Sequence, residues 1–152
     1  MILSYIESLI PFFFGIPGMK LGLSNLAVVF ALYTYGGKEA LTINIVRIVA
    51  VAVLFGNVMS LVFSVSGALL SLVLMLLFKR TKAFSVMGVS IVGGVAHNAG
   101  QLIAAVFVVK NYKVAFYLPF LIIAGLVTGF IIGIISNEVL KRIKVRQEED
   151  RN

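Results

Sequence analysis

Long apolar runs separated by short polar breaks are the feature that most limits what this chain can fold into. Six such runs occur, at about residues 2–14, 21–35, 40–56, 58–78, 84–109 and 114–136. A helix needs about 17–25 mainly apolar residues to cross the roughly 30 Å hydrocarbon core of a bilayer. The sequence therefore predicts an all-α, polytopic membrane protein. A six-transmembrane-helix bundle would form one domain over residues 1–136, followed by a charged tail over residues 137–152.

The first run is short, because residues 2–14 would reach only about 20 Å as a helix. Either this helix begins at the cytoplasmic interface, or it is truncated relative to the first helix of related chains. Met1 is followed at once by apolar residues, whereas a cleaved signal peptide begins with a basic region. We therefore expect residues 2–14 to stay in the mature protein.

Composition supports the membrane class and argues against nucleic acid as a partner. The chain is 61% hydrophobic and 12% charged, with a mean hydropathy of +1.09, whereas roughly a quarter of the residues in a soluble domain are charged. The formal net charge is +7, but the basic residues lie in short breaks and in the tail, with no exposed aromatic platform between them. The expected environment is the lipid bilayer, and no nucleic acid is expected to bind.

Lysine and arginine are distributed unequally between the two sides of the predicted bundle. One side would hold Lys38, Lys79, Arg80, Lys82, Lys141, Arg142, Lys144, Arg146 and Arg151; the other would hold Lys20, Lys110 and Lys113. Because basic loops stay in the cytoplasm, both termini are predicted to be cytoplasmic. Arg47 and His97 would then lie near the middle of the membrane, with Asn25 and Gln101 somewhat nearer the outer face.

A polar stretch interrupts the fifth apolar run. Residues 93–101 contain the only histidine of the chain, His97, together with Asn98 and Gln101. Polar groups at hydrocarbon depth must find a partner within the protein, a ligand or a hydrated cavity. His97 and Gln101 are four residues apart, so they share one helix face. Taken singly, each residue could form an interhelical hydrogen bond worth about 0.6–2 kcal/mol; together they could form one wall of a pocket.

Arg47 lies within the third apolar run, where burial of an arginine costs at least about 2.5 kcal/mol. Glu7 is the only acidic residue predicted at a comparable depth. Three alternatives follow. Glu7 and Arg47 could form a buried ion pair that joins two helices, or Arg47 could bind an anionic substrate. Proton coupling through Glu7 and His97 is the third.

Glycines repeat every fourth residue in the sixth run, at Gly125, Gly129 and Gly133. Such spacing lets helices approach closely. We interpret it as close packing within the bundle, with docking to a partner membrane protein as the alternative.

The sequence also lacks the residues that several functions need. It has no cysteine and only one histidine, so no metal site is predicted. It has no P-loop, so the chain is not expected to hydrolyse ATP. Its acidic residues form no aspartate-rich cluster to hold magnesium and a diphosphate; they are Glu7, Glu39, Glu138, Glu148, Glu149 and Asp150. We therefore predict a protein that is not an enzyme, with no catalytic residue and no cofactor.

Three segments resemble a known family. These are LSYIESLIP at 3–11, GMKLGLSN at 18–25 and AHNAGQL at 96–102. They are similar to small bacterial membrane proteins described as heptaprenyl diphosphate synthase component I, also called the Gx transporter family. The resemblance covers nearly the whole chain. It implies a multi-pass protein of the bacterial cytoplasmic (inner) membrane.

That family is in turn similar to the substrate-binding S components of energy-coupling-factor (ECF) transporters, which are six-helix proteins with a lid over an outward-facing pocket. The resemblance implies a lid at residues 15–20, formed by Gly15, Pro17 and Gly18. It also implies partners: a membrane scaffold subunit and ATPases. The candidate substrate-binding residues are Lys20, Asn25, Arg47, His97, Asn98 and Gln101. The first run departs from the S components in being shorter and in lacking their alanine-spaced docking face.

The leading hypothesis is therefore a membrane-embedded, S-component-like subunit of a transporter, which takes up a small anionic molecule related to isoprenoids or quinones. The alternative is a noncatalytic membrane subunit that is associated with heptaprenyl diphosphate synthase. A third hypothesis, that the chain is the catalytic synthase itself, conflicts with its lack of an aspartate-rich cluster.

Overall fold

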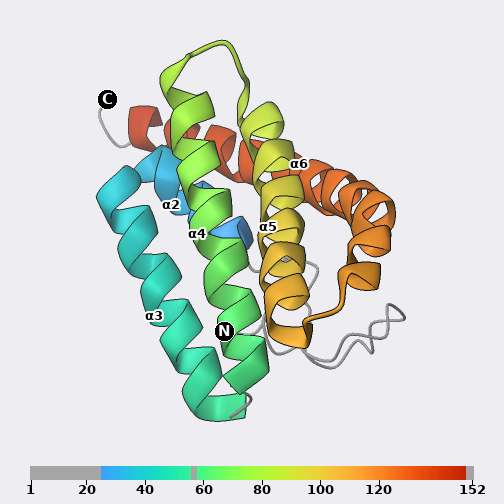
Figure 1. Ribbon diagram of the computed structural model, residues 1–152. Coiled ribbons are helices and arrows are strands. Elements are labelled where there is room, and N and C mark those ends of the chain that lie inside the picture. The colour runs from blue at the N-terminus through green and yellow to red at the C-terminus, as the bar shows by residue number, and fades with distance from the viewer. Residues whose placement is uncertain (1–24, 56–57, 150–152) are drawn as a thin grey trace.

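A computed structural model describes residues 25–55 and 58–149 of the chain (Figure 1). These residues form helices and no strand, which confirms the all-α prediction. The helices are α2 (Asn25–Thr34), α3 (Gly37–Phe55), α4 (Val58–Arg80), α5 (Val86–Val109), the short 3₁₀ helix η1 (Tyr112–Tyr117) and α6 (Leu118–Glu149). The predicted helix at 2–14, the predicted lid at 15–20 and two candidate site residues, Glu7 and Lys20, lie outside the described residues.

Local capping explains where several helices begin and end. The backbone N–H groups of Tyr35 and Gly36 both donate to the Ala31 carbonyl, at 2.9 and 3.0 Å, and so end α2. Gly36 has a φ of 126°, a conformation that glycine adopts without steric cost. The Ser85 hydroxyl accepts a hydrogen bond from the Gly88 N–H and caps the start of α5. Lys110, in the left-handed conformation, ends the same helix.

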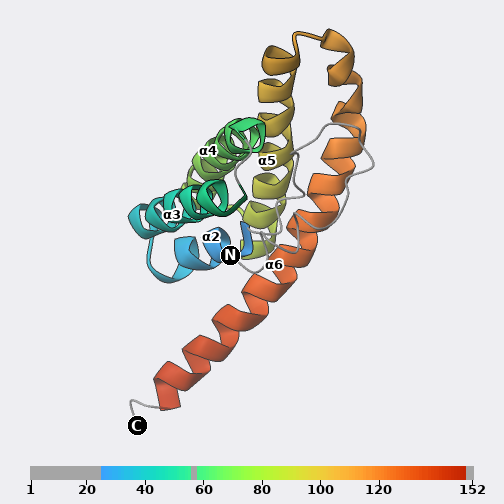
Figure 2. The same cartoon turned by 90° about the horizontal axis from the view of Figure 1, so that it is seen from below.

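The last helix is longer than the predicted run at 114–136. α6 continues through the predicted tail as far as Glu149. Residues 137–149 contain neither glycine nor proline, and Arg142 Nε lies 3.2 Å from Glu138 Oε1 one turn away. Because no helix-breaking residue follows the apolar run, the helix continues beyond it. Figure 2 shows its C-terminal part extending past the other helices.

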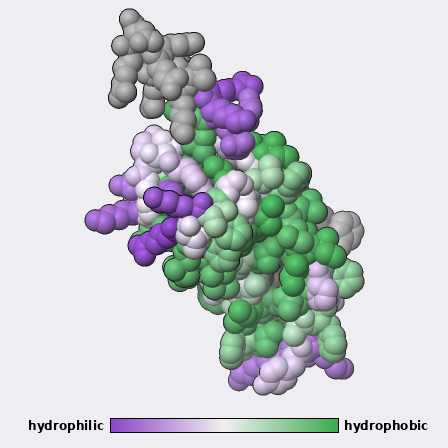
Figure 3. Space-filling model, turned by 90° about the horizontal axis from the view of Figure 1, so that it is seen from above, coloured by the Kyte–Doolittle hydropathy of each residue, from purple (hydrophilic) through white to green (hydrophobic). Residues whose placement is uncertain are grey.

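Within residues 25–55 and 58–149, three helical spans are long and apolar enough to cross a membrane, at Leu61–Arg80, Val86–Val109 and Tyr112–Ile143. α2 is a shorter apolar helix. Hydrophobic side chains cover the middle of the surface in Figure 3, while hydrophilic ones gather toward two ends. These features support a membrane protein. The count of six spans and the cytoplasmic position of both termini stay predictions.

α5 is the central helix of the bundle. It packs along α4 on one side and along α6 on the other, and α2 contacts both α3 and α6 (Figures 1 and 2). Of the α5 span, 56% is buried, against 33% for each of the other two spans. Side chains of α5 are therefore the ones most enclosed by the protein.

Glycines bring α5 and α6 into backbone contact. A Cβ atom added at Gly94 would stand 2.4 Å from the Gly125 carbonyl oxygen. Cβ atoms added at Gly129 and Gly133 would stand 2.6 and 2.8 Å from α5 Cα atoms. Gly125, Gly129 and Gly133 thus all face α5. The four-residue spacing of these glycines therefore lets α6 pack closely against α5.

Two apolar clusters fill the interior. The first is built from Val28, Val29, Ala31, Leu32, Ala40, Leu72, Met75, Val89 and Ile132. The second is built from Phe63, Leu102, Ala104, Ala105, Val114 and Leu121. On α4 and α5 the residues between these clusters are 64–71 and 90–101. The polar stretch of α5 therefore lies between two apolar layers.

Candidate functional site

Buried polar residues occupy the level between the two apolar clusters, and we refer to them as the central polar layer. It comprises Asn25, Asn44, Arg47, Ser71, His97, Asn98 and Gln101, each at most 9% exposed. They come from four helices, α2 to α5. Such residues are costly at membrane depth, so their partners decide what the layer does.

Asn25 joins three helices through one chain of hydrogen bonds. Its Nδ2 donates to Ser71 Oγ at 3.3 Å, and Ser71 Oγ donates to the Gly93 carbonyl at 2.8 Å. Ser71 lies nine residues before Arg80, the end of α4, or about 14 Å away at 1.5 Å per residue. Asn25 is therefore on the side of the bundle where α4 and α5 connect. In the predicted orientation this is the cytoplasmic half, whereas the sequence alone suggested a position nearer the outer face.

Arg47 is held on α3 by a neighbouring asparagine. Its Nη2 donates to Asn44 Oδ1 at 2.8 Å, and Asn44 Nδ2 donates to the Ala68 carbonyl of α4 at 3.3 Å. Asn44 thus links the guanidinium to a second helix. Glu7, the predicted ion-pair partner of Arg47, lies outside the described residues.

His97 and Gln101 lie side by side against Gly67 of α4. A Cβ atom added at Gly67 would stand 3.1 Å from His97 Cε1 and 2.9 Å from Gln101 Cγ. The absence of a side chain at Gly67 is what leaves room for both. Because the Ala68 carbonyl holds Asn44, the imidazole, the carboxamide and the Asn44–Arg47 pair lie at neighbouring levels along α4.

Asn98 faces the other way. Its Nδ2 donates to the Leu121 carbonyl of α6 at 2.8 Å. Consecutive residues of a helix point about 100° apart, so Asn98 and His97 reach different neighbours. The candidate residues therefore divide into a group near α4, formed by Arg47, His97 and Gln101, and an α5–α6 contact at Asn98. The remaining candidate, Lys20, is not among the described residues.

The family model described as heptaprenyl diphosphate synthase component I matches residues 1–139. The chain belongs to this family. No curated protein and no solved structure matched the chain. The resemblance that the sequence motifs indicated is thus confirmed for the family, and similarity to ECF S components stays a prediction.

The buried polar side chains of this family member both donate and accept hydrogen bonds, and Arg47 only donates. An arginine, an imidazole and two carboxamides lie in the group near α4 and at Asn44. Of the described acidic side chains, Glu39 and Glu138 are both exposed. No group of three His, Cys, Asp or Glu residues that could hold a metal ion occurs within residues 25–55 and 58–149.

Two members of the layer were not predicted as site residues. Asn44 lies three residues before Arg47, and this spacing places both on one helix face, which is a signal the sequence offered. Ser71 is a serine in an apolar run, and nothing in its spacing distinguishes it from other serines of α4.

We expect Asn98→Leu to lower the stability of the folded chain. Loss of the contact with the Leu121 carbonyl should cost about 0.6–2 kcal/mol, the usual value for a hydrogen bond between membrane helices. Thermal unfolding in detergent would measure the loss. A variant with normal stability would show that this hydrogen bond does not hold α5 to α6.

Proposed function

We propose that the chain is a membrane-embedded substrate-binding subunit, similar to an ECF S component, that takes up a small anionic molecule related to isoprenoids or quinones. The observation that carries this proposal is the burial of Arg47, His97 and Gln101 between two apolar clusters.

Arg47 is the residue that favours an anion. A guanidinium presents five N–H donors in a planar fork, which matches the oxygens of carboxylates and phosphates. Asn44 fixes the orientation of this fork through the 2.8 Å hydrogen bond. His97 and Gln101 add donors on α5, which, like α3, packs against α4. The apolar residues of the two clusters would contact the rest of an amphiphilic ligand.

The other polar residues have a structural role in this proposal. Asn25, Ser71 and Asn98 direct their hydrogen bonds to neighbouring helices. They hold the bundle around the ligand, and Arg47, His97 and Gln101 contact it. The lid at 15–20 and the contribution of Lys20 stay predictions, as do the scaffold subunit and ATPases that an S component needs.

Native mass spectrometry of gently extracted protein tests the proposal. We expect the wild-type chain to retain a small anionic molecule, and Arg47→Gln to reduce its occupancy about tenfold or more, since one charge-assisted hydrogen bond is worth about 1.5–3 kcal/mol. Lys38→Gln, which removes an exposed cation from the start of the same helix, should retain the ligand.

Size-exclusion chromatography would establish that each variant is folded. If folded Arg47→Gln and folded His97→Ala both keep full occupancy, the proposed binding site is wrong. Arg47→Lys should give an intermediate occupancy, because it keeps the charge and loses the planar fork.

Membership of the family favours a second candidate, a noncatalytic membrane subunit associated with heptaprenyl diphosphate synthase. Proteins recovered with the chain from its native membrane distinguish the two. ATPases and a membrane scaffold would support transport, whereas a soluble, aspartate-rich synthase would support the second candidate. Prenyl transfer by the purified chain alone would contradict both.

A further inference from the structure

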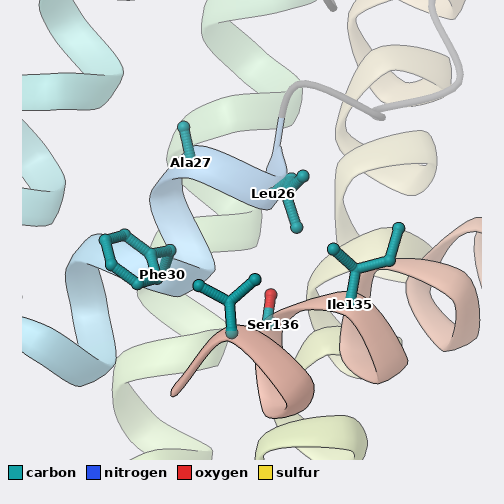
Figure 4. A pocket seen from close by; sticks show the side chains of 6 residues that line it. Leu26, Ala27, Phe30, Ile135 and Ser136 are labelled. Carbon is teal, nitrogen blue, oxygen red and sulfur yellow. The ribbon is translucent and has the colours of Figure 1, made fainter. Parts of the chain in front are cut away.

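A cavity lies between α2 and α6, and its lining includes no residue of the central polar layer. Its volume is about 250 Å³, and Figure 4 shows the side chains that surround it. The lining residues are Leu26, Ala27, Phe30, Ile135, Ser136 and Val139. None of them belongs to the central polar layer, and Ser136 contributes the only polar side chain of this lining.

Ser136 has a hydroxyl that the protein does not satisfy. Its side chain is fully buried, at 0% exposure, and its Oγ has no hydrogen-bond partner among the described residues. A serine inside a membrane helix ordinarily donates to the carbonyl four residues earlier. Thr128 of the same helix does so, with Oγ1 2.8 Å from the Ala124 carbonyl. Ser136 is therefore an exception within its own helix.

A water molecule does not explain this hydroxyl. An ordered buried water needs about two to four polar partners, whereas the side chains around this cavity offer one. A buried hydroxyl without a partner costs free energy, so a ligand atom that accepts its hydrogen would be stabilising. The rest of such a ligand would contact apolar side chains.

The cavity is placed to receive a molecule from the bilayer. Ile135 and Val139, which line it, are 42% and 38% exposed. Both belong to the span Tyr112–Ile143, which is apolar enough to cross the membrane. The volume is just below the roughly 300–1,000 Å³ of pockets that enclose a whole drug-sized ligand. It suits one end of a longer molecule whose remainder stays in the lipid.

We propose that this cavity binds a neutral, lipid-soluble molecule that carries one hydrogen-bond acceptor, such as an ester carbonyl. Ser136 Oγ donates its hydrogen to that acceptor. Leu26 and Phe30 of α2 and Val139 of α6 contact the apolar chain. The site is independent of anion binding at Arg47, so loss of one leaves the other intact.

Photolabelling of the full chain in nanodiscs tests the proposal, with a diazirine-bearing fatty-acid methyl ester as the probe. We expect saturable labelling of the tryptic peptides 21–38 and 114–141, which contain α2 and the membrane part of α6. Methyl palmitate should compete for this labelling. Ala27→Phe, which places a ring in the cavity, should abolish the saturable component.

The role of Ser136 is tested with two competitors, methyl palmitate and hexadecane. Ser136→Ala should weaken competition by methyl palmitate about three- to tenfold, the range expected for loss of one hydrogen bond, and leave competition by hexadecane unchanged. Ser90→Ala is the matched control, because Ser90 is also buried with an unsatisfied hydroxyl but does not line this cavity.

Labelling that is not saturable, or that spreads evenly over the lipid-facing helices, would show ordinary bilayer contact and overturn the proposal. Equal effects of Ser136→Ala on the ester and the alkane would overturn the assigned hydrogen bond. Retention of a small anion by Ser136→Ala in native mass spectra would show that the Arg47 site is intact in the same preparation.

Discussion

Gly94→Val is expected to destabilise the folded chain by about 3 kcal/mol or more, the upper end of the range for overpacking a tightly packed interior. A Cβ atom at this position would stand 2.4 Å from the Gly125 carbonyl oxygen and 3.1 Å from Gly129 Cα. Both are backbone atoms of α6, so no side-chain rotation relieves the clash, and the two helices must separate. Loss of the monodisperse size-exclusion peak on heating would measure the effect.

Gly88→Val supplies the control on the same helix. A Cβ atom there would meet only the Phe84 side chain, at 3.3 Å or more. Phe84 is 44% exposed, so its ring has space to move. We expect a loss of about 1 kcal/mol, the lower end of the range for overpacking. If Gly94→Val is equally mild, the backbones of α5 and α6 do not approach as closely as the structure shows.

Asn44→Leu is expected to lower stability by about 1.5–3 kcal/mol, the value of a hydrogen bond to a charged group. The substitution removes the acceptor that lies 2.8 Å from Arg47 Nη2. It also removes the hydrogen bond that Asn44 Nδ2 donates to the Ala68 carbonyl of α4. Because Arg47 is buried, water does not replace the lost contact fully. Thermal unfolding of the purified variant in detergent would report the change.

Thr42→Val is the matched control, a polar-to-apolar change two residues earlier in α3. The Thr42 hydroxyl is exposed and donates within its own helix, to the Lys38 carbonyl at 3.0 Å. The expected change is within about 0.5 kcal/mol. Similar losses for Thr42→Val and Asn44→Leu would argue that helix propensity, and not the contact with Arg47, determines the result.

Helix positions followed from the sequence wherever polar breaks were sharp. The predicted runs at 58–78 and 84–109 lie within two residues of α4 and α5 at each end, because a basic cluster with Ser85 separates them and Lys110 follows the second. The start of α3 was harder to predict from the sequence. Gly36 and Gly37 suggested a break, yet Gly37 is already helical, since the Gly36 carbonyl accepts from the Ala40 N–H.

The candidate site was predictable in its residue types more than in its geometry. Periodicity placed His97 and Gln101 on one helix face, and the structure puts both beside Gly67. Periodicity carries no information on which helix each face meets, so it does not show that the Asn98 amide reaches the Leu121 carbonyl of α6. The depth of Asn25 along the bundle depends on where α2 begins. Hydropathy gives no information on that position.

Because α6 is one uninterrupted helix from Leu118 to Glu149, a change of its angle at one end moves its other end. Its 32 residues form a rod of about 48 Å, whereas the hydrocarbon core is about 30 Å thick. Backbone contact at Gly125, Gly129 and Gly133 prevents this part of α6 from sliding independently of α5, the helix that carries His97 and Gln101. The part of α6 beyond Gly133 extends about 24 Å to Glu149 at 1.5 Å per residue, so a tilt of about 10° at the glycine contact would move its end by roughly 4 Å. Small changes in the angle between α5 and α6 would thus be amplified at the C-terminal end of α6.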